Sequence, residues 1–366
     1  MAADLQAESS LIYIRELFLQ DLPGNGPQGR VLHGNIMTAL LIRAAAVLVA
    51  VMILSLIIDN RRFVVRRYRL RSDRINYPVK IVFIADLHEK RYGQDNEKLV
   101  EKIRETAPDV ILVGGDLIVS GAVFKASEKD KGTDNGDSGT DAEWMKNSLS
   151  LIQKLAKICP VWFVQGNHEL RMEYYGELDE YNKKFISEMS KAGLRFLHNK
   201  SVDPAAESHD GLDSGIRRQG LELPMKFYKK FRKTKLTMEE LTGLIGEADR
   251  SVYTVLMSHI PVYFPVYADW GSDLCLCAHV HGGLMRLPLL GGVMGTRPSL
   301  FPKYSGGQYY RRVAVGKEQH LSSMILTCGL GMHTLPIRIF NPGEVSLVEL
   351  LPASDPDRQE EENGTK

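Results

Sequence analysis

The chain has 366 residues, of which 44% are hydrophobic and 25% are charged, and its formal net charge is +1. This composition is typical of a globular protein with a sizeable core, and it lacks the basic excess expected of a nucleic-acid-binding protein. The four cysteines, Cys159, Cys275, Cys277 and Cys328, are too few and too scattered for a disulfide framework or a C-x-x-C zinc site. We therefore expect reduced, buried thiols.

Residues 1–34 form a separate N-terminal segment, and the most apolar part of the chain follows it. Residues 36–58 contain a single charge, Arg43. A helix of this length is about 35 Å long, enough to span a hydrocarbon core of about 30 Å. We therefore predict a transmembrane helix over residues 35–58. A signal peptide fits less well because no basic region precedes the stretch and no small-residue cleavage site follows it. A helix lying in the membrane interface is the alternative, since Arg43 shortens the purely apolar part.

Seven arginines follow this helix within fourteen residues: Arg61, Arg62, Arg66, Arg67, Arg69, Arg71 and Arg74. By the positive-inside rule, this excess predicts a single-pass protein of the cell membrane with the rest of the chain on the cytoplasmic side, the outer face being the alternative. We interpret residues 59–75 as a basic juxtamembrane linker whose arginines contact membrane lipids.

The region from residue 76 to residue 352 alternates short apolar runs with charged stretches of helical period. Apolar runs at residues 79–85, 110–114, 161–164, 252–257 and 274–278 predict strands, and residues 96–106, 144–157 and 179–192 predict helices. This alternation predicts an α/β domain. Polar segments at 125–143 and 202–218 are interpreted as mobile surface insertions, and residues 353–366 as an acidic disordered tail.

The first predicted strand ends on an acid and a histidine, in the sequence IADLH. In an extended chain Asp86 and His88 point to the same side and can converge on a cation. On this fragment alone, an aspartate that caps a helix, followed by a solvated histidine, is the more common arrangement and the favoured interpretation.

The other predicted strands end in the same kinds of residue. These are Asp116, the run Asn167, His168 and Glu169, and the histidines His259, His279 and His281. Any one of them is more often a satisfied core residue than a ligand. Because ligands bind at the carboxyl ends of strands in open α/β sheets, their joint occurrence predicts a single site.

Five motifs between residues 84 and 283, IADLH, GGDL, GNHE, SHIP and AHVHGG, resemble in order and spacing the calcineurin-like metallophosphoesterases. The downstream GLGMHTLPIRIF and NPGE resemble the membrane-anchored bacterial branch related to the YkuE and YaeI phosphodiesterases. The resemblance implies a metallophosphoesterase-type four-layer αββα sandwich as catalytic domain, here preceded by one transmembrane helix. Ala278 replaces a usual glycine and Leu284 a common glutamine, which affects loop geometry and leaves the ligand set intact.

The same resemblance implies two divalent metal ions. Asp86, His88 and His281 would bind one ion, Asn167, His259 and His279 the other, and Asp116 both. Carboxylate and imidazole ligands favour Mn²⁺, with Fe or Zn²⁺ as alternatives. A hydroxide bridging both ions would attack phosphorus, and the catalytic residue His168 would stabilise the transition state or protonate the leaving oxygen. Glu169 would orient a neighbour.

We therefore expect a membrane-anchored phosphoesterase acting on phosphodiester or pyrophosphate bonds of a lipid-linked or nucleotide-containing substrate, without a nucleic-acid partner. Apolar segments at residues 264–267 and 286–295 suggest a substrate with an apolar part, although anchoring of loops explains them equally well. A UDP-2,3-diacylglucosamine pyrophosphohydrolase is the alternative enzyme. A non-catalytic metal-binding scaffold is the alternative of another class. His333, in a glycine-rich loop, either lines the site or serves only the loop.

Overall fold

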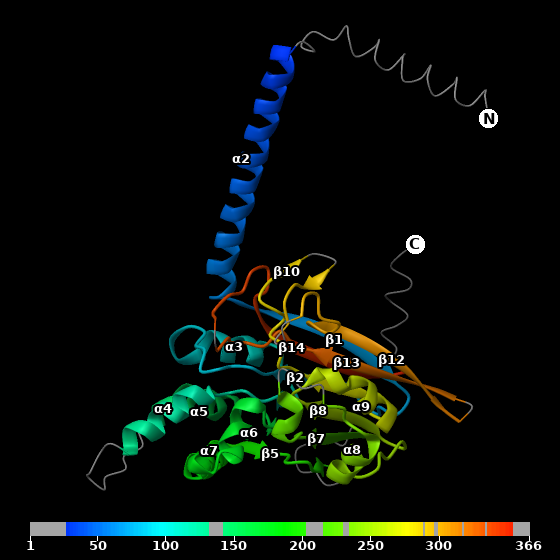
Figure 1. Cartoon of the computed structure of the whole chain (residues 1–366). Helices are drawn as coiled ribbons and strands as arrows, with labels where there is room; N and C mark the ends of the chain where they lie inside the picture. The colour runs from blue at the N-terminus through cyan, green and yellow to red at the C-terminus, as the bar shows by residue number, and fades with distance from the viewer. Residues whose placement is uncertain are drawn as a thin grey trace, which may run out of the picture. The chain divides into compact units, whose positions relative to one another are not determined.

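The computed structural model describes residues 27–131, 142–202, 215–229, 234–287, 290–295, 299–316, 318–333 and 335–353. The chain divides into two compact units, Met1–Ser55 and Leu56–Lys366 (Figure 1). The two units are described separately below.

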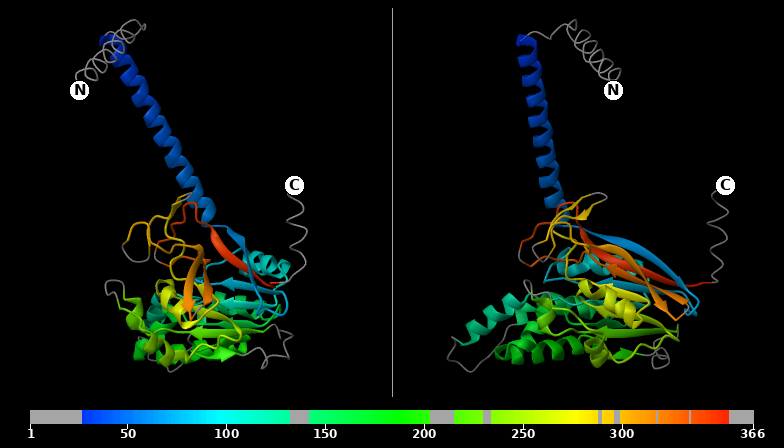
Figure 2. Two further views of the ribbon diagram at one scale, coloured as in Figure 1. Left: turned by 90° about the vertical axis from the view of Figure 1, so that its right-hand side faces the viewer. Right: turned by 45° about the vertical axis from the view of Figure 1, so that its right-hand side comes forward.

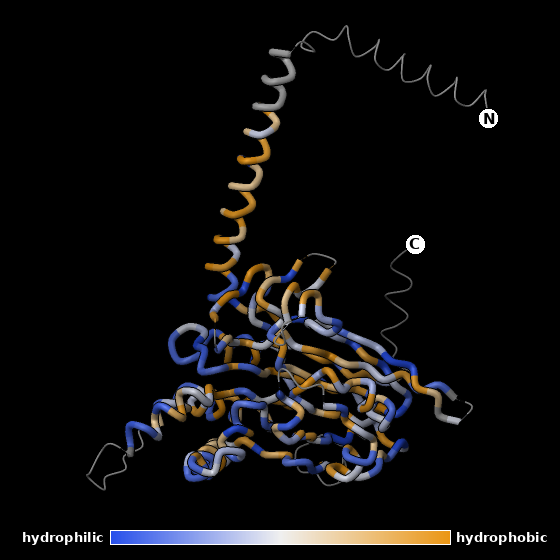
Figure 3. Tube along the Cα trace, viewed as in Figure 1, coloured by the Kyte–Doolittle hydropathy of each residue, from blue (hydrophilic) through white to orange (hydrophobic). Residues whose placement is uncertain are grey.

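Most of helix α2, Pro27–Asp59, belongs to the first unit. Its stretch Ile36–Asp59 is long and apolar enough to cross a membrane, and apolar residues follow one another along it (Figure 3). The helix begins eight residues before the predicted residue 35. Pro27 explains this start, because proline at the first helical position has a suitable φ and lacks an N–H that would have no partner there. The rest of the predicted N-terminal segment, residues 1–26, lies outside the described residues.

The second unit contains two six-stranded sheets (Figures 1 and 2). The first has the order β1-β14-β2-β3-β4-β5, formed by β1 (Phe63–Ser72), β14 (Gly343–Pro352), β2 (Val79–Ile84), β3 (Val110–Val113), β4 (Val161–Phe163) and β5 (Leu194–Phe196). The second has the order β12-β13-β9-β8-β7-β6, formed by β12 (Gly307–Val315), β13 (Glu318–Leu326), β9 (Leu274–Cys277), β8 (Tyr253–Ser258), β7 (Ile216–Leu221) and β6 (Ser201–Val202). Strands β2 to β5 are parallel, as are β7, β8, β9 and β13. A small pair, β10 (Arg286–Leu287) and β11 (Gly291–Gly292), lies apart from both.

Helices cover the outer faces of the sheets. The described α-helices of this unit are α3 (Glu97–Glu105), α4 (Ser120–Lys131), α5 (Lys146–Leu155), α6 (Asn167–Tyr174), α7 (Asp179–Lys191), α8 (Met238–Ile245) and α9 (Phe264–Trp270). The described short 3-10 helices are η1 (Gln94–Asn96), η2 (Ala142–Trp144), η3 (Gly176–Leu178), η5 (Met225–Tyr228) and η6 (Pro261–Tyr263). The predicted α/β class is confirmed, and the five predicted strands and three predicted helices are all present.

Three apolar clusters define the layers. Ile111 of β3 packs with residues of α3, α5 and α7, whereas Phe83 of β2 packs with Val255 of β8 between the two sheets. On the far side of the second sheet, Leu256 packs with residues of α8 and α9. Both faces of each central strand are therefore buried, which explains why these strands are apolar without alternation. The order of layers is helices, sheet, sheet, helices.

The predicted juxtamembrane linker, residues 59–75, is wrong over most of its length, because β1 occupies it. This strand pairs in parallel with β14 along all ten residues. Its charges fit an edge strand: Arg66 forms an ion pair with the buried Glu344, and Arg69 pairs with Glu349. Exposed and partly buried residues alternate along residues 67–72, which is the pattern of an edge strand.

Parts of the predicted insertions are regular structure. Helix α4 continues to Lys131, and β7 covers residues 216–218, while residues 132–141 and 203–214 lie outside the described residues. The apolar segment 264–267 begins α9, and Phe264 and Tyr267 are buried in the core, so core packing of this helix explains these two residues. Of the predicted acidic tail, residues 354–366 also lie outside the described residues. The four cysteines, all described, are free; Cys159 is partly exposed and the other three are buried.

Candidate metal centre

The carboxyl ends of five strands, three from one sheet and two from the other, bring the predicted site residues together. Asp86 and His88 follow β2, Asp116 follows β3, Asn167 and His168 begin α6 after β4, His259 follows β8, and His279 and His281 follow β9. All of these side chains are buried except that of His279, which is partly exposed. The structure therefore places every predicted ligand and the predicted catalytic histidine in one region.

The backbone at these positions is strained. Asp86, His88, Asp116, His279 and His281 all have φ between 47° and 75°. This left-handed region is uncommon for residues other than glycine, and such residues concentrate at functional sites. The turn lets each strand end abruptly and leaves its last side chains facing the other sheet's strand ends.

A glycine permits the close approach of two of these loops. A Cβ atom on Gly166 would lie 2.2 Å from Asp116 Oδ1, too close for any side chain. The backbone N–H of His168 donates to that same oxygen over 2.8 Å. The glycine of the GNHE motif thus lets α6 begin directly against the Asp116 carboxylate.

Asp116 and Asp86 lie at the centre of the histidines. Asp116 Oδ2 is 3.2 Å from His259 Nε2 and 3.8 Å from His88 Nε2. Asp86 Oδ1 is 3.8 Å from His259 Nε2, and Asp86 Oδ2 is 3.9 Å from His281 Nδ1. Three groups among the described residues have potential ligand atoms within 4.8 Å of one another. Two contain a carboxylate, Asp86, His88 and His281 in one and Asp116, His259 and His279 in the other, and the third consists of His88, His168 and His333.

Hydrogen bonds sort the histidines into two kinds. Nδ1 of His88, His259 and His281 lies 3.2, 2.7 and 3.1 Å from the carbonyl oxygens of Ile118, Gly114 and Gly331. A carbonyl only accepts, so each Nδ1 carries the proton and Nε2 offers a lone pair, the arrangement typical of metal-binding histidines.

His168 has the opposite arrangement. The backbone N–H of Ser120 donates to its Nδ1 over 2.9 Å. Nδ1 therefore accepts, and the proton of the neutral ring is on Nε2, which lies 3.9 Å from Asp116 Oδ2. Although its atoms are near those of His88 and His333, His168 presents a donor to the site and not a ligand lone pair.

Several buried atoms in this region have no hydrogen-bond partner among the described residues. They are Asp86 Oδ1, His88 Nε2, Asn167 Oδ1, His168 Nε2 and His259 Nε2. Burying unpaired polar atoms is costly, and native proteins rarely leave such a group together without a reason. Four of the five are oxygens or nitrogens with a lone pair aimed into the site, which fits divalent cations as the missing partners.

The electrostatics agree with this fit for His88 and His281. Burial opposes protonation of His259, but the nearby Asp116 carboxylate outweighs it and raises the pKa of His259 to about 9, so a cation would have to displace its proton. Burial raises the pKa of the Asp86 carboxyl to about 7. Burial also opposes ionisation of Asp116, but the nearby His259 and His168 outweigh it and hold the pKa of Asp116 well below its usual value. Burial lowers the pKa of His88, and it lowers that of His281 to about 3. Neutral imidazoles are the form that binds metal, and a cation would relieve the crowding of two buried carboxylates.

Glu169 holds the loops that carry the ligands. Its carboxylate accepts hydrogen bonds from the backbone N–H groups of Asp116, Leu117 and Gly166 at 2.8–2.9 Å. Among the described residues, its carboxylate forms no hydrogen bond to the side chain of a predicted ligand. This agrees with the orienting role expected of it.

The sequence analysis missed Arg338 and Asn341. Arg338 is 2% exposed and donates to the carbonyls of Cys328, Gly329 and Gly331, so it fixes the loop whose Gly331 carbonyl accepts from His281. Asn341 donates to the carbonyl of His281 over 2.8 Å. The LPIRIFNP run, with an arginine inside an apolar stretch, was the available signal for both residues.

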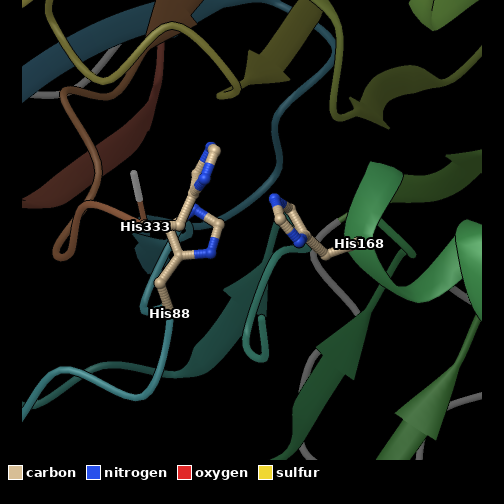
Figure 4. A group of neighbouring side chains, drawn as sticks. All are labelled: His88, His168 and His333. Carbon is tan, nitrogen blue, oxygen red and sulfur yellow. The ribbon is translucent and has the colours of Figure 1, made fainter. Parts of the chain in front are cut away.

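His333, whose role the sequence left open, lies at the site. Its ring centre is 4.8 Å from that of His88 and 4.6 Å from that of His168. Figure 4 shows the ring of His168 reaching from α6 toward the other two rings. His333 is exposed, and so it covers the outer side of the buried histidines.

An α/β fold with aspartates and histidines gathered at its strand ends provides a candidate metal centre. The chain belongs to the calcineurin-like phosphoesterase family, whose sequence profile matches residues 79–283. The chain is similar to the uncharacterized protein YpbG of Bacillus subtilis, 26% identical over 216 residues, which are 58% of this chain and 65% of that protein.

Two further relatives are named as phosphoesterases. An uncharacterized metallophosphoesterase of Helicobacter pylori is 24% identical over 285 residues, 76% of this chain and 62% of its own length. The phosphodiesterase YaeI of Escherichia coli is 25% identical over 231 residues, 62% of this chain and 69% of its own length. The chain thus spans less than two thirds of YpbG and of the Helicobacter protein.

Proposed function

We propose that this protein is a membrane-anchored, metal-dependent phosphoesterase that hydrolyses phosphodiester or pyrophosphate bonds of a lipid-linked or nucleotide-containing substrate. The observation that carries the proposal is the set of buried atoms with lone pairs and no hydrogen-bond partner on Asp86, His88, Asn167 and His259, all at the strand ends. Such a cluster of lone pairs can bind divalent cations, and the cations would neutralise the negative charge of a phosphate ester.

Asp86, His88 and His281 would hold one divalent cation and Asn167, His259 and His279 the other, with Asp116 between them. When bound, two such cations supply charge neutralisation for the ester and an activated water. Mn²⁺ is the favoured ion for these oxygen and imidazole ligands, and Fe or Zn²⁺ are the alternatives.

His168 adds a hydrogen-bond donor from the protein. Because Ser120 N–H donates to its Nδ1, the neutral ring carries its hydrogen on Nε2, which lies 3.9 Å from Asp116 Oδ2 and would donate to a phosphate oxygen bound beside that carboxylate. Protonating Nδ1 would break that bond, and burial lowers the pKa of His168 to about 4. This favours transition-state stabilisation by a neutral donor over proton delivery to the leaving oxygen.

Membrane anchoring rests on the stretch Ile36–Asp59, and its orientation on the arginines that follow. The positive-inside rule counts Lys and Arg near the membrane helix whether or not they belong to a strand. The arginines of β1 therefore still favour the cytoplasmic side for the unit that follows the helix. We place the catalytic unit on the cytoplasmic side, where it would act close to the inner leaflet.

The test is a hydrolysis assay on the full chain, stripped of metal and reloaded with Mn²⁺, against bis-p-nitrophenyl phosphate and a pyrophosphate diester. We expect Mn²⁺-dependent turnover of at least one. A folded chain that binds Mn²⁺ and hydrolyses neither ester nor a membrane lipid extract would instead support the non-catalytic scaffold.

A further inference from the structure

An apolar pocket of about 430 Å³ opens beside the candidate metal centre and shares His279 with it. This volume falls within the range of roughly 300–1,000 Å³ that is typical of small-molecule sites. Its apolar walls include Ile260, Val262, Pro265, Val280, Leu300 and Phe301.

The pocket is joined to the metal centre through the chain itself. Ile260 directly follows the predicted ligand His259, and Val280 lies between His279 and His281. The same two strand ends that direct imidazoles inward therefore direct apolar side chains into the pocket. A ligand whose phosphorus lies among the histidines needs only a short connection to reach it.

The rim of the pocket is unusually apolar for a surface. Leu300 is 68% exposed, Phe301 53% and Val262 42%. Exposed apolar side chains that gather around a concavity mark a binding site more often than isolated ones do. Lys303, also in the lining, offers a positive charge to an anionic group.

We propose that this pocket binds a hydrocarbon chain esterified to the phosphorus that the centre hydrolyses, so that the preferred substrates are alkyl or acyl-glycerol phosphoesters. The inference rests on the proposed function and names its substrate class. A planar nucleobase fits less well, because Ser299, Lys303 and Tyr304 are few polar groups with which to recognise its edge.

The test is a series of p-nitrophenyl phosphodiesters whose second alcohol is methanol, butanol or octanol, hydrolysed by the Mn²⁺-loaded full chain in lipid nanodiscs. Burial of each methylene should raise kcat/KM by roughly fourfold, so incomplete burial should still give at least tenfold between methyl and butyl esters. Thymidine p-nitrophenyl phosphate tests the nucleotide alternative, and a preference for it over the octyl ester would overturn the proposal.

Two variants and a matched control locate the effect. Val262→Asp and Leu300→Asp should bring the butyl-to-methyl ratio of kcat/KM toward one, because a carboxylate disfavours a hydrocarbon neighbour. Leu321→Asp changes a leucine of similar exposure, 51%, on β13 outside this pocket, and should leave the ratio unchanged. An unchanged ratio in both pocket variants would show that the chain binds elsewhere.

A binding measurement separates this proposal from the proposed function. Titration calorimetry with methyl-, butyl- and octylphosphonate should give tighter binding and a more negative heat-capacity change as the chain lengthens. Turnover of all three esters at equal kcat/KM would overturn the pocket assignment and leave the phosphoesterase intact. Absence of any hydrolysis, with phosphonate binding that still depends on chain length and on Leu300, would instead refute the enzyme and retain the pocket.

Discussion

Replacing His168 separates two roles that the site permits. The ring accepts a hydrogen bond from Ser120 N–H at Nδ1 and directs Nε2–H toward Asp116, 3.9 Å away. A neutral donor of this kind stabilises developing charge wherever it appears on the phosphate. We therefore expect His168→Ala to lower kcat by about 10²–10³, the range found when one preorganised donor is removed, or about 2.7–4 kcal/mol.

The dependence on the leaving group distinguishes a donor from a general acid. A general acid matters most when the leaving oxygen is basic, so its loss would slow alkyl esters far more than p-nitrophenyl esters. A neutral donor predicts a similar loss for both. The assay is kcat for the two ester types in the wild type and in His168→Ala, with bound Mn²⁺ measured by elemental analysis of the same samples.

Metal content provides the check on the assignment of the proton. Because Nε2 of His168 carries a hydrogen, it has no lone pair for a cation, and the variant should retain both ions. A fall in bound Mn²⁺, or a loss confined to alkyl esters, would refute the reasoning. Glu173→Ala, which changes an exposed residue of α6, is the control for changes in this helix.

Four further outcomes follow from the structure. Asp116→Asn should lose bound Mn²⁺ and hydrolysis while its circular dichroism stays native; near-normal turnover would exclude a shared ligand. Arg338→Met should lower the free energy of unfolding, measured by denaturant titration, by about 1–3 kcal/mol, because it removes the side-chain donor from the buried carbonyls of Cys328 and Asn341; an unchanged free energy would contradict this role. The hydrogen bond to Glu222 raises the pKa of His198. This pair should therefore stabilise the fold by at most about 1 kcal/mol below about pH 6.5, and the effect should disappear as the pH rises through the raised pKa. His198→Gln should accordingly lower the free energy of unfolding more at low pH than at high pH, and an equal loss at both would contradict this. Deleting residues 1–55 should release the protein from membranes with little change in turnover of a soluble ester, and digestion of the catalytic unit in wall-stripped intact cells would place it outside.

The central strands were predictable because burial on both faces imposes a composition. Val110–Val113 and Leu274–Cys277 are entirely apolar, and each is followed within a few residues by a polar ligand type. The edge strand β1 was not predictable from charge counts, since its arginines look like a membrane-facing cluster. Only pairing with β14, some 280 residues later in the chain, gives Arg66 a buried partner in Glu344.

For the site too, some features follow from neighbouring residues in the sequence and others depend on distant contacts. Ligand types adjoin strands in the sequence, so Asp86 and His259 could be named from it. The proton on His168 depends on Ser120, 48 residues earlier, and the tautomer of His281 depends on Gly331, 50 residues later. Local patterns contain no such contacts, so they indicated candidate ligands at the strand ends and left open what each ring nitrogen does.

The cost of the site explains why its support is so extensive. Asp86 and Asp116 are fully buried carboxylates on left-handed backbone, and each feature alone opposes folding. Glu169 and Arg338 offset that cost from opposite sides by satisfying the backbone groups of the loops concerned. Hydrogen bonds to the loops do not satisfy the ligand atoms themselves, and so the fold preserves a set of lone pairs suited to binding cations. Residues that hold the loops should therefore affect stability and metal binding together. His168 accepts the Ser120 N–H at Nδ1 and offers no lone pair to a cation at Nε2, so its loss should affect the reaction and the stability without releasing the metal.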